Sequence, residues 1–192
     1  MPPACRVARH PIGAWRRSGE VDWFAMIFRV LHIGAGTFWV GSAFLFFFFI
    51  DPSTRVLAPD ALQGFMSELM GRRRTAAVIF VASLITVLAG LVLYWRASSG
   101  FDLDWVTSST GIGFTLGGIA ALVSFFVGLL VIMPSIRGLG TLGEQIAAAD
   151  RPPTEEEGAR LHALESRLQA AGRADLVGLS LAVLFMAIAR YL

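Results

Sequence analysis

Several residue types are scarce or missing in this chain, and each shortage excludes a class of protein. Lysine is absent, so all 16 basic residues are arginine, and the 192 residues include one cysteine and three histidines. A single cysteine rules out an intramolecular disulfide and a cysteine metal cluster. The formal charge of +2 is too small to indicate a nucleic-acid partner. The sequence has no Gly-rich phosphate loop, nucleophile triad or zinc motif, which excludes a soluble-type hydrolase.

Apolar residues, by contrast, make up 55% of the chain, and its mean hydropathy is +0.65. They are concentrated in four blocks instead of being spread at amphipathic spacing. A block of about 20 apolar residues is long enough to cross a bilayer as a helix. We therefore predict an all-α fold, an integral membrane four-helix bundle surrounded by lipid. The predicted spans cover residues 24–50, 75–95, 111–133 and 174–192, after a disordered tail at residues 1–23.

Prolines mark the predicted ends of the first and third spans. Asp51-Pro52 and Pro134 each follow an uncharged run, and proline disfavours helical geometry in the residue before it. The loop after the first span is predicted to hold an amphipathic helix over residues 60–70, with Asp60 as its N-cap.

The loop after the third span carries a stronger helix signal. Thr154 and Glu157 have the spacing of a capping box, in which each residue bonds the backbone N–H of the other. One face of the helix that follows is apolar, formed by Leu161, Leu164 and Leu168. The fourth span then reaches the far interface with Arg190 and Tyr191.

An internal repeat links the two halves of the chain. The segment IDPSTRVL (residues 50–57) ends the first span and IMPSIRGL (residues 132–139) ends the third, with five of eight positions identical. Gly36 aligns with Gly118 in the same register, and Gly-Arg precedes both the second and the fourth span. We interpret the chain as two parallel helical-hairpin repeats that arose by duplication; chance similarity between span ends is the alternative.

Arginine placement predicts the orientation, because short cytoplasmic loops carry an excess of arginine. The two long loops hold nine arginines and the opposite side holds seven, four of them in the N-terminal tail. We therefore expect both amphipathic loop helices to be cytoplasmic and both termini to be periplasmic. Exclusive use of arginine, with abundant alanine, glycine and leucine, indicates a high-GC bacterial genome and so an inner-membrane location.

His32 is the leading candidate for chemistry, because an ionisable group inside a span is costly and is by default a functional hypothesis. On a helix, His32 shares one face with Gly36, Trp39, Ala43 and Phe46, and this face is small and polar apart from its aromatic residues. If that face points into the bundle, a neutral imidazole with Gly36 and Trp39 beside it can ligate a haem iron or a metal ion such as copper. The alternative is that His32 only bonds a carbonyl or a head group.

Other polar residues in the spans are interpreted mainly as packing positions. Small residues at helical spacing let helices approach closely in lipid. Two such stripes are formed by Ser83, Thr86, Gly90 and Tyr94, and by Gly113, Gly117, Ser124 and Gly128. Asp175 is expected at the interface near Arg173, with a proton relay as the alternative.

The segment RVLHIGAGTFWVG (residues 29–41) resembles the first helix of small bacterial membrane proteins of the copper-resistance-D-like class. The shared pattern is R-x-L-H, then W-x-G, then an aromatic-rich run ending in proline. This resemblance implies a four-helix bundle with His32 facing inward and suggests passage of copper. The same helix is similar, more loosely, to HemJ-type protoporphyrinogen oxidases, which have a haem-associated histidine.

Three functions follow from these observations. The first is binding or passage of haem or a metal ion at the His32 layer. The second is a cofactor-free membrane scaffold that forms a homo-oligomer or binds a membrane-protein partner through its cytoplasmic helices. The third is an oxidoreductase acting on a tetrapyrrole or a quinone.

Overall fold

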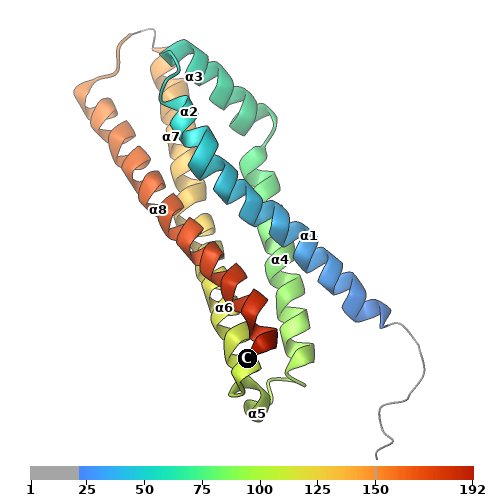
Figure 1. The fold of residues 1–192 in the computed structure, drawn as a ribbon. Coiled ribbons are helices and arrows are strands. Elements are labelled where there is room, and N and C mark those ends of the chain that lie inside the picture. The colour runs from blue at the N-terminus through green and yellow to red at the C-terminus, as the bar shows by residue number, and fades with distance from the viewer. Residues whose placement is uncertain (1–21, 150) are drawn as a thin grey trace, which may run out of the picture.

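A computed structural model describes residues 22–149 and 151–192. This part of the chain is helical and contains no strand, and four of its helices are long and apolar enough to cross a membrane (Figure 1). The predicted all-α membrane four-helix bundle is therefore confirmed. The predicted disordered tail lies, up to residue 21, outside the described residues.

The elements follow one another as a series of helices with short connections. The first hairpin comprises α1 (Trp23–Leu45), η1 (Phe46–Ile50), α2 (Asp51–Thr54), α3 (Pro59–Met66), η2 (Ser67–Arg72) and α4 (Thr75–Ala97). The second comprises α6 (Ser109–Val127), η3 (Gly128–Ile132), α7 (Met133–Ala148), α8 (Glu155–Ile188) and η4 (Ala189–Tyr191). A short helix, α5 (Leu103–Val106), lies in the connection between the two hairpins.

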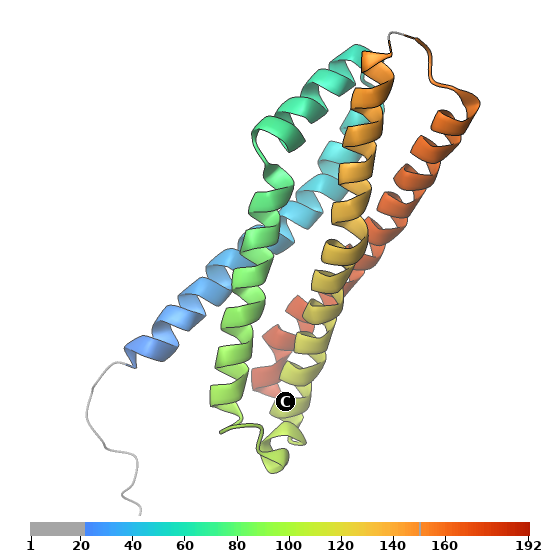
Figure 2. The ribbon, with the colours of Figure 1, turned by 180° about the vertical axis from the view of Figure 1, so that it is seen from behind.

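Packing is tight within each hairpin and sparse between the hairpins. Helix α1 packs mainly on α4, and α6 packs mainly on α8, whereas α1 meets α8 and α4 meets α6 at fewer positions. The start of α1, the α5 connection and the C-terminus lie at one end of the bundle (Figures 1 and 2). The loop before α3 and the loop between α7 and α8 lie at the other end, which we call the loop end.

Neither predicted proline break ends its helix. The backbone continues from Trp23 to Thr54 and from Ser109 to Ala148, and in each case a π-helical turn ends two residues before the proline. In those turns the N–H of Asp51 bonds the carbonyl of Phe46, and the N–H of Met133 bonds the carbonyl of Gly128. The wider turn accommodates a residue that lacks an N–H and whose ring would otherwise clash with the preceding turn.

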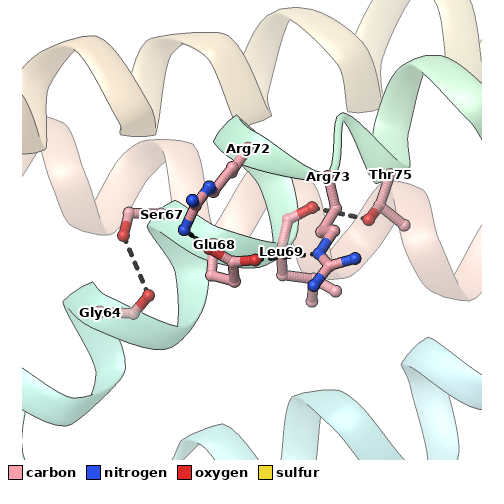
Figure 3. A network of polar contacts seen from close by, with 7 residues as sticks. All are labelled: Gly64, Ser67, Glu68, Leu69, Arg72, Arg73 and Thr75. Carbon is pink, nitrogen blue, oxygen red and sulfur yellow. Dashed lines mark hydrogen bonds and ion pairs between the residues drawn. The ribbon is translucent and has the colours of Figure 1, made fainter.

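The turn between η2 and α4 is fixed by polar contacts within the chain. Glu68 accepts hydrogen bonds from both Arg72 and Arg73, and the Thr75 hydroxyl donates to the Leu69 carbonyl at 2.6 Å (Figure 3). Arg74 takes a left-handed backbone conformation there, with φ 51°. This conformation is uncommon for a residue with a side chain and makes the sharp entry into α4.

The predicted N-cap of the helix before this turn is wrong. Helix α3 begins at Pro59 with Ala58 as its N-cap and without a side-chain cap. Proline is well suited to the first helical position, because it lacks an N–H and an N–H at that position would have no partner within the helix.

The capping box at the start of α8 is confirmed, with reciprocal bonds between Thr154 and Glu157. The helix then runs without a break through Gly172-Arg173 into the fourth span. A Cβ on Gly138 of α7 would lie 3.2 Å from the side chain of Leu164. The apolar face of this loop helix therefore packs against α7, so α7 and α8 extend the second hairpin beyond the end of α4.

Candidate functional site

His32 lies in the interface between α1 and α4. Its Nδ1 is 2.8 Å from the backbone carbonyl oxygen of Thr86, and its side chain is half-buried. The ring occupies the space left by the missing side chain of Gly90, where a Cβ would lie 2.8 Å from His32 Cε1. The histidine is thus held by a backbone acceptor and by a glycine of the neighbouring helix.

This hydrogen bond fixes the tautomer of the imidazole. A carbonyl oxygen only accepts hydrogen bonds, so Nδ1 must be the protonated nitrogen. In the neutral ring the lone pair is then on Nε2. Histidines that ligate metals are oriented in this way, with one nitrogen bonded to a carbonyl or carboxylate and the other free for the metal.

The other two predicted site residues lie on the same face of α1. A Cβ on Gly36 would lie 3.2 Å from the Thr86 Cγ2, so Gly36 lets the two helices approach one turn after His32. Trp39 is 5% exposed and is the only residue of α1 that is fully buried. His32 and Gly36 therefore lie in the α1–α4 interface, and helical spacing places Trp39 on the same face of α1.

The site lies about one and a half helical turns from the aromatic residue that closes the second span. Gly90, which is level with His32, precedes the interfacial Trp95 by five residues, or about 8 Å along the helix. At that end Asp22 caps α1 and forms an ion pair with Arg96 of α4. The Arg96 guanidinium also lies 5.4 Å from the centre of the Phe24 ring. These contacts hold α1 and α4 together just outside the His32 layer.

The donor set of the described residues suits a haem iron and does not make a complete copper site. Within the described residues, no group of three His, Cys, Asp or Glu side chains lies close enough to hold a metal ion. A haem iron needs only an axial imidazole, because the porphyrin supplies four nitrogens. A copper ion needs several side-chain ligands, and His32 supplies one.

Two open hollows of the described surface lie away from His32. One is lined by Ile146, Ala147, Arg151 and Pro152, and the other by Arg74, Ala77, Val78 and Val81.

The two small-residue stripes take part in packing, as predicted. Ser83 and Thr86 are buried, and the Tyr94 hydroxyl is 2.6 Å from the Thr115 hydroxyl of α6. In the second stripe Gly117 packs on Met186 and Gly113 on Ala189. Gly128 is the exception, because a Cβ there would meet open space.

Two residues of the bundle have observed roles that were not predicted. The Thr86 backbone carbonyl is the partner of His32, and a backbone acceptor leaves no trace in the sequence. Asp175 was expected at the interface, yet it is 7% exposed and packs against α6, where its carbonyl accepts a bond from the Ser124 hydroxyl.

The fold and these contacts define an α-helical integral membrane protein built from two hairpins. Comparison with protein-family models, with curated proteins and with solved structures finds no match. The resemblance to the copper-resistance-D-like class therefore rests on the residues of α1 alone.

Proposed function

We propose that this chain is a bacterial inner-membrane protein that binds haem, with Nε2 of His32 as an axial ligand of the iron. The observation that carries the proposal is the hydrogen bond from His32 Nδ1 to the Thr86 carbonyl. That bond orients the ring and leaves Nε2 with its lone pair, which is the state a haem iron requires. Bound haem would supply redox or ligand-binding chemistry in the membrane.

Copper passage, which the resemblance suggests, has weaker support. The described residues contribute a single imidazole to the His32 layer, and a copper ion would need further donors. Haem would require no such completion, because the porphyrin itself would supply four nitrogen ligands. We therefore place haem first and copper second.

The proposed orientation follows from charge and topology. The start of α1 and the C-terminus lie at the same end of the bundle, opposite the two arginine-rich loops. Placing those loops in the cytoplasm satisfies the bias of arginine toward the cytoplasmic side. The His32 layer is then near the periplasmic surface.

An absorption spectrum of the protein purified in mild detergent and titrated with haem tests the proposal. We expect a Soret band at about one haem for every one or two chains, which His32→Ala abolishes. His162→Ala is the matched control, since His162 is an exposed histidine of α8 and the substitution should leave the band unchanged. Metal analysis of the same samples detects copper.

A colourless wild type that does not bind added haem would contradict the proposal. The scaffold function would then be favoured, with His32 acting only as a clamp between α1 and α4. Haem binding that persists in His32→Ala would instead show that the haem site lies outside the His32 layer.

A further inference from the structure

Asp175 is the second ionisable side chain enclosed by the membrane bundle. Only 7% of the residue is exposed, and its carboxyl Oδ1 has no hydrogen-bond partner among the described residues. The Ser124 hydroxyl of α6 donates to the backbone carbonyl of Asp175 at 3.3 Å. A Cβ on Gly178 would lie 2.3 Å from the Ser124 Oγ, so α6 and α8 are closely packed beside the carboxyl.

The aromatic contacts locate this carboxyl along the membrane axis. Phe125, which follows Ser124, stacks on Phe80 of α4 with ring centres 5.8 Å apart. Phe80 is five residues beyond Thr75, so the Asp175 level is about 8 Å inside the boundary marked by Arg74. The carboxyl is therefore near the loop end of the span, whereas His32 is near the opposite end.

No basic side chain compensates Asp175 in the described residues. Arg173 is two positions away on α8, where residues do not face each other, and it is exposed. None of the ion pairs of the described residues includes Asp175. The elements packed on α8 carry few charged or titratable residues, and α6, η3 and η1 have none. The others are Arg137 and Glu144 of α7, Arg29 and His32 of α1, and Arg190 and Tyr191 of η4.

The positions of those charged residues place them away from the carboxyl. Arg29, His32 and the η4 residues belong to the opposite end of the bundle. Arg137 neighbours Gly138, which packs on Leu164, and Leu164 is eleven residues before Asp175 on α8, or about 16 Å. Glu144 is farther along α7 in the same direction. An ionised Asp175 would thus be a buried charge without a counter-ion, which a protein interior strongly disfavours.

We propose that the Asp175 carboxyl is a proton-binding site, which carries a proton at neutral pH and exchanges it with the water at the loop end. A proton is the cation that one carboxyl binds by itself, whereas metal ions require several oxygen or nitrogen ligands. A protonated carboxyl also suits the dry α6–α8 interface, since it is neutral. This site is separate from the His32 layer and does not depend on haem binding.

Infrared absorption of the wild-type protein in lipid vesicles, recorded across pH, tests this site directly. We expect at pH 7 the C=O band of about one protonated carboxyl per chain, shifted in D₂O and replaced by carboxylate absorption at alkaline pH. The band should be missing in Asp175→Asn, which keeps the size of the neutral side chain. Asp104→Asn, which alters an exposed carboxylate of α5, is the matched control and should retain the band.

Three results would overturn the proposal. The first is carboxylate absorption alone in the wild type at pH 7. The second is a protonated-carboxyl band that neither exchanges with D₂O nor titrates. The third is a band that persists in Asp175→Asn. Because the first two are read from the wild type, they hold even if a variant fails to fold.

Discussion

The imidazole of His32 fills the notch that Gly90 leaves in α4, and a Cβ on Gly90 would lie 2.8 Å from its Cε1 atom. The glycine and the histidine are thus one packing unit across two helices. The fold positions the ring by this notch and by the Thr86 carbonyl, with no side-chain acceptor.

Gly90→Ala is expected to destabilise the protein by about 1–3 kcal/mol, because the new methyl group must displace the His32 ring. The displaced ring would also lose its bond to Thr86, so any haem spectrum should change. Thermal unfolding in mild detergent measures the first effect and absorption the second. Gly34→Ala on α1 meets open space and should be neutral or slightly stabilising. Equal effects of the two substitutions would contradict this packing.

Gly178→Ala is expected to destabilise the α6–α8 interface, since its Cβ would lie 2.3 Å from the Ser124 hydroxyl oxygen. Ser124→Ala removes that oxygen, and the remaining Ser124 Cβ is 3.6 Å from the same point. The double variant should therefore be more stable than Gly178→Ala alone. A double-mutant cycle of unfolding free energies measures the coupling, which we expect to exceed about 0.5 kcal/mol. Strict additivity would show that the two sites do not touch.

Gly111→Ala and Gly118→Ala form a matched pair on α6. A Cβ on Gly111 would lie 2.0 Å from the Trp105 carbonyl oxygen, and backbone cannot move aside as a side chain can. We expect a loss of about 3 kcal/mol or failure to fold. Gly118 has open space around it and should gain up to about 1 kcal/mol from the higher helix propensity of alanine. Thermal unfolding of both variants checks the prediction, and comparable Tm values would refute it.

The stability of the first turn of α8 should depend on pH in the acidic range. The pKa of Glu157 falls from 4.5 to about 2, because its carboxylate accepts hydrogen bonds from Arg151 and from the Thr154 backbone N–H. A lowered pKa in the folded state means that the contribution to stability is complete above about pH 4.5 and is lost as the pH falls toward 2. The protection factors of the amides in the first turn of α8, which remove the intrinsic pH dependence of exchange, should fall over that range. In Glu157→Gln the same protection factors should already be lower at neutral pH and show little further change.

The four-helix membrane fold was predictable because long uncharged runs have few alternatives to crossing the bilayer as helices. The helix ends were less predictable. Pro52 and Pro134 each predict a helix end, but a π-helical turn before the proline lets the helix continue. That turn depends on the backbone geometry several residues upstream. Gly172-Arg173 likewise resembles a span boundary, yet α8 passes through it because Leu164 and its neighbours pack on α7.

One side of the candidate site was predictable from the sequence, and the other side was not. Helical spacing alone places His32, Gly36 and Trp39 on one face of α1. The partner face was not predictable, because it consists of a carbonyl and of a glycine that has no side chain. The burial of Asp175 was hidden by the adjacent Arg173, which suggested an aqueous interface.

The π-helical turns have a further consequence for the history of the chain. Phe46–Ile50 and Gly128–Ile132 occupy equivalent positions of the internal repeat, and the proline follows at the same interval in both copies. Two independent acquisitions of the same widened turn at the same position would be a coincidence. We infer that an ancestral single hairpin already had this turn and its proline before the gene doubled. In this interpretation, His32 and Asp175 distinguish the two halves, since neither residue type recurs at the equivalent position of the other copy.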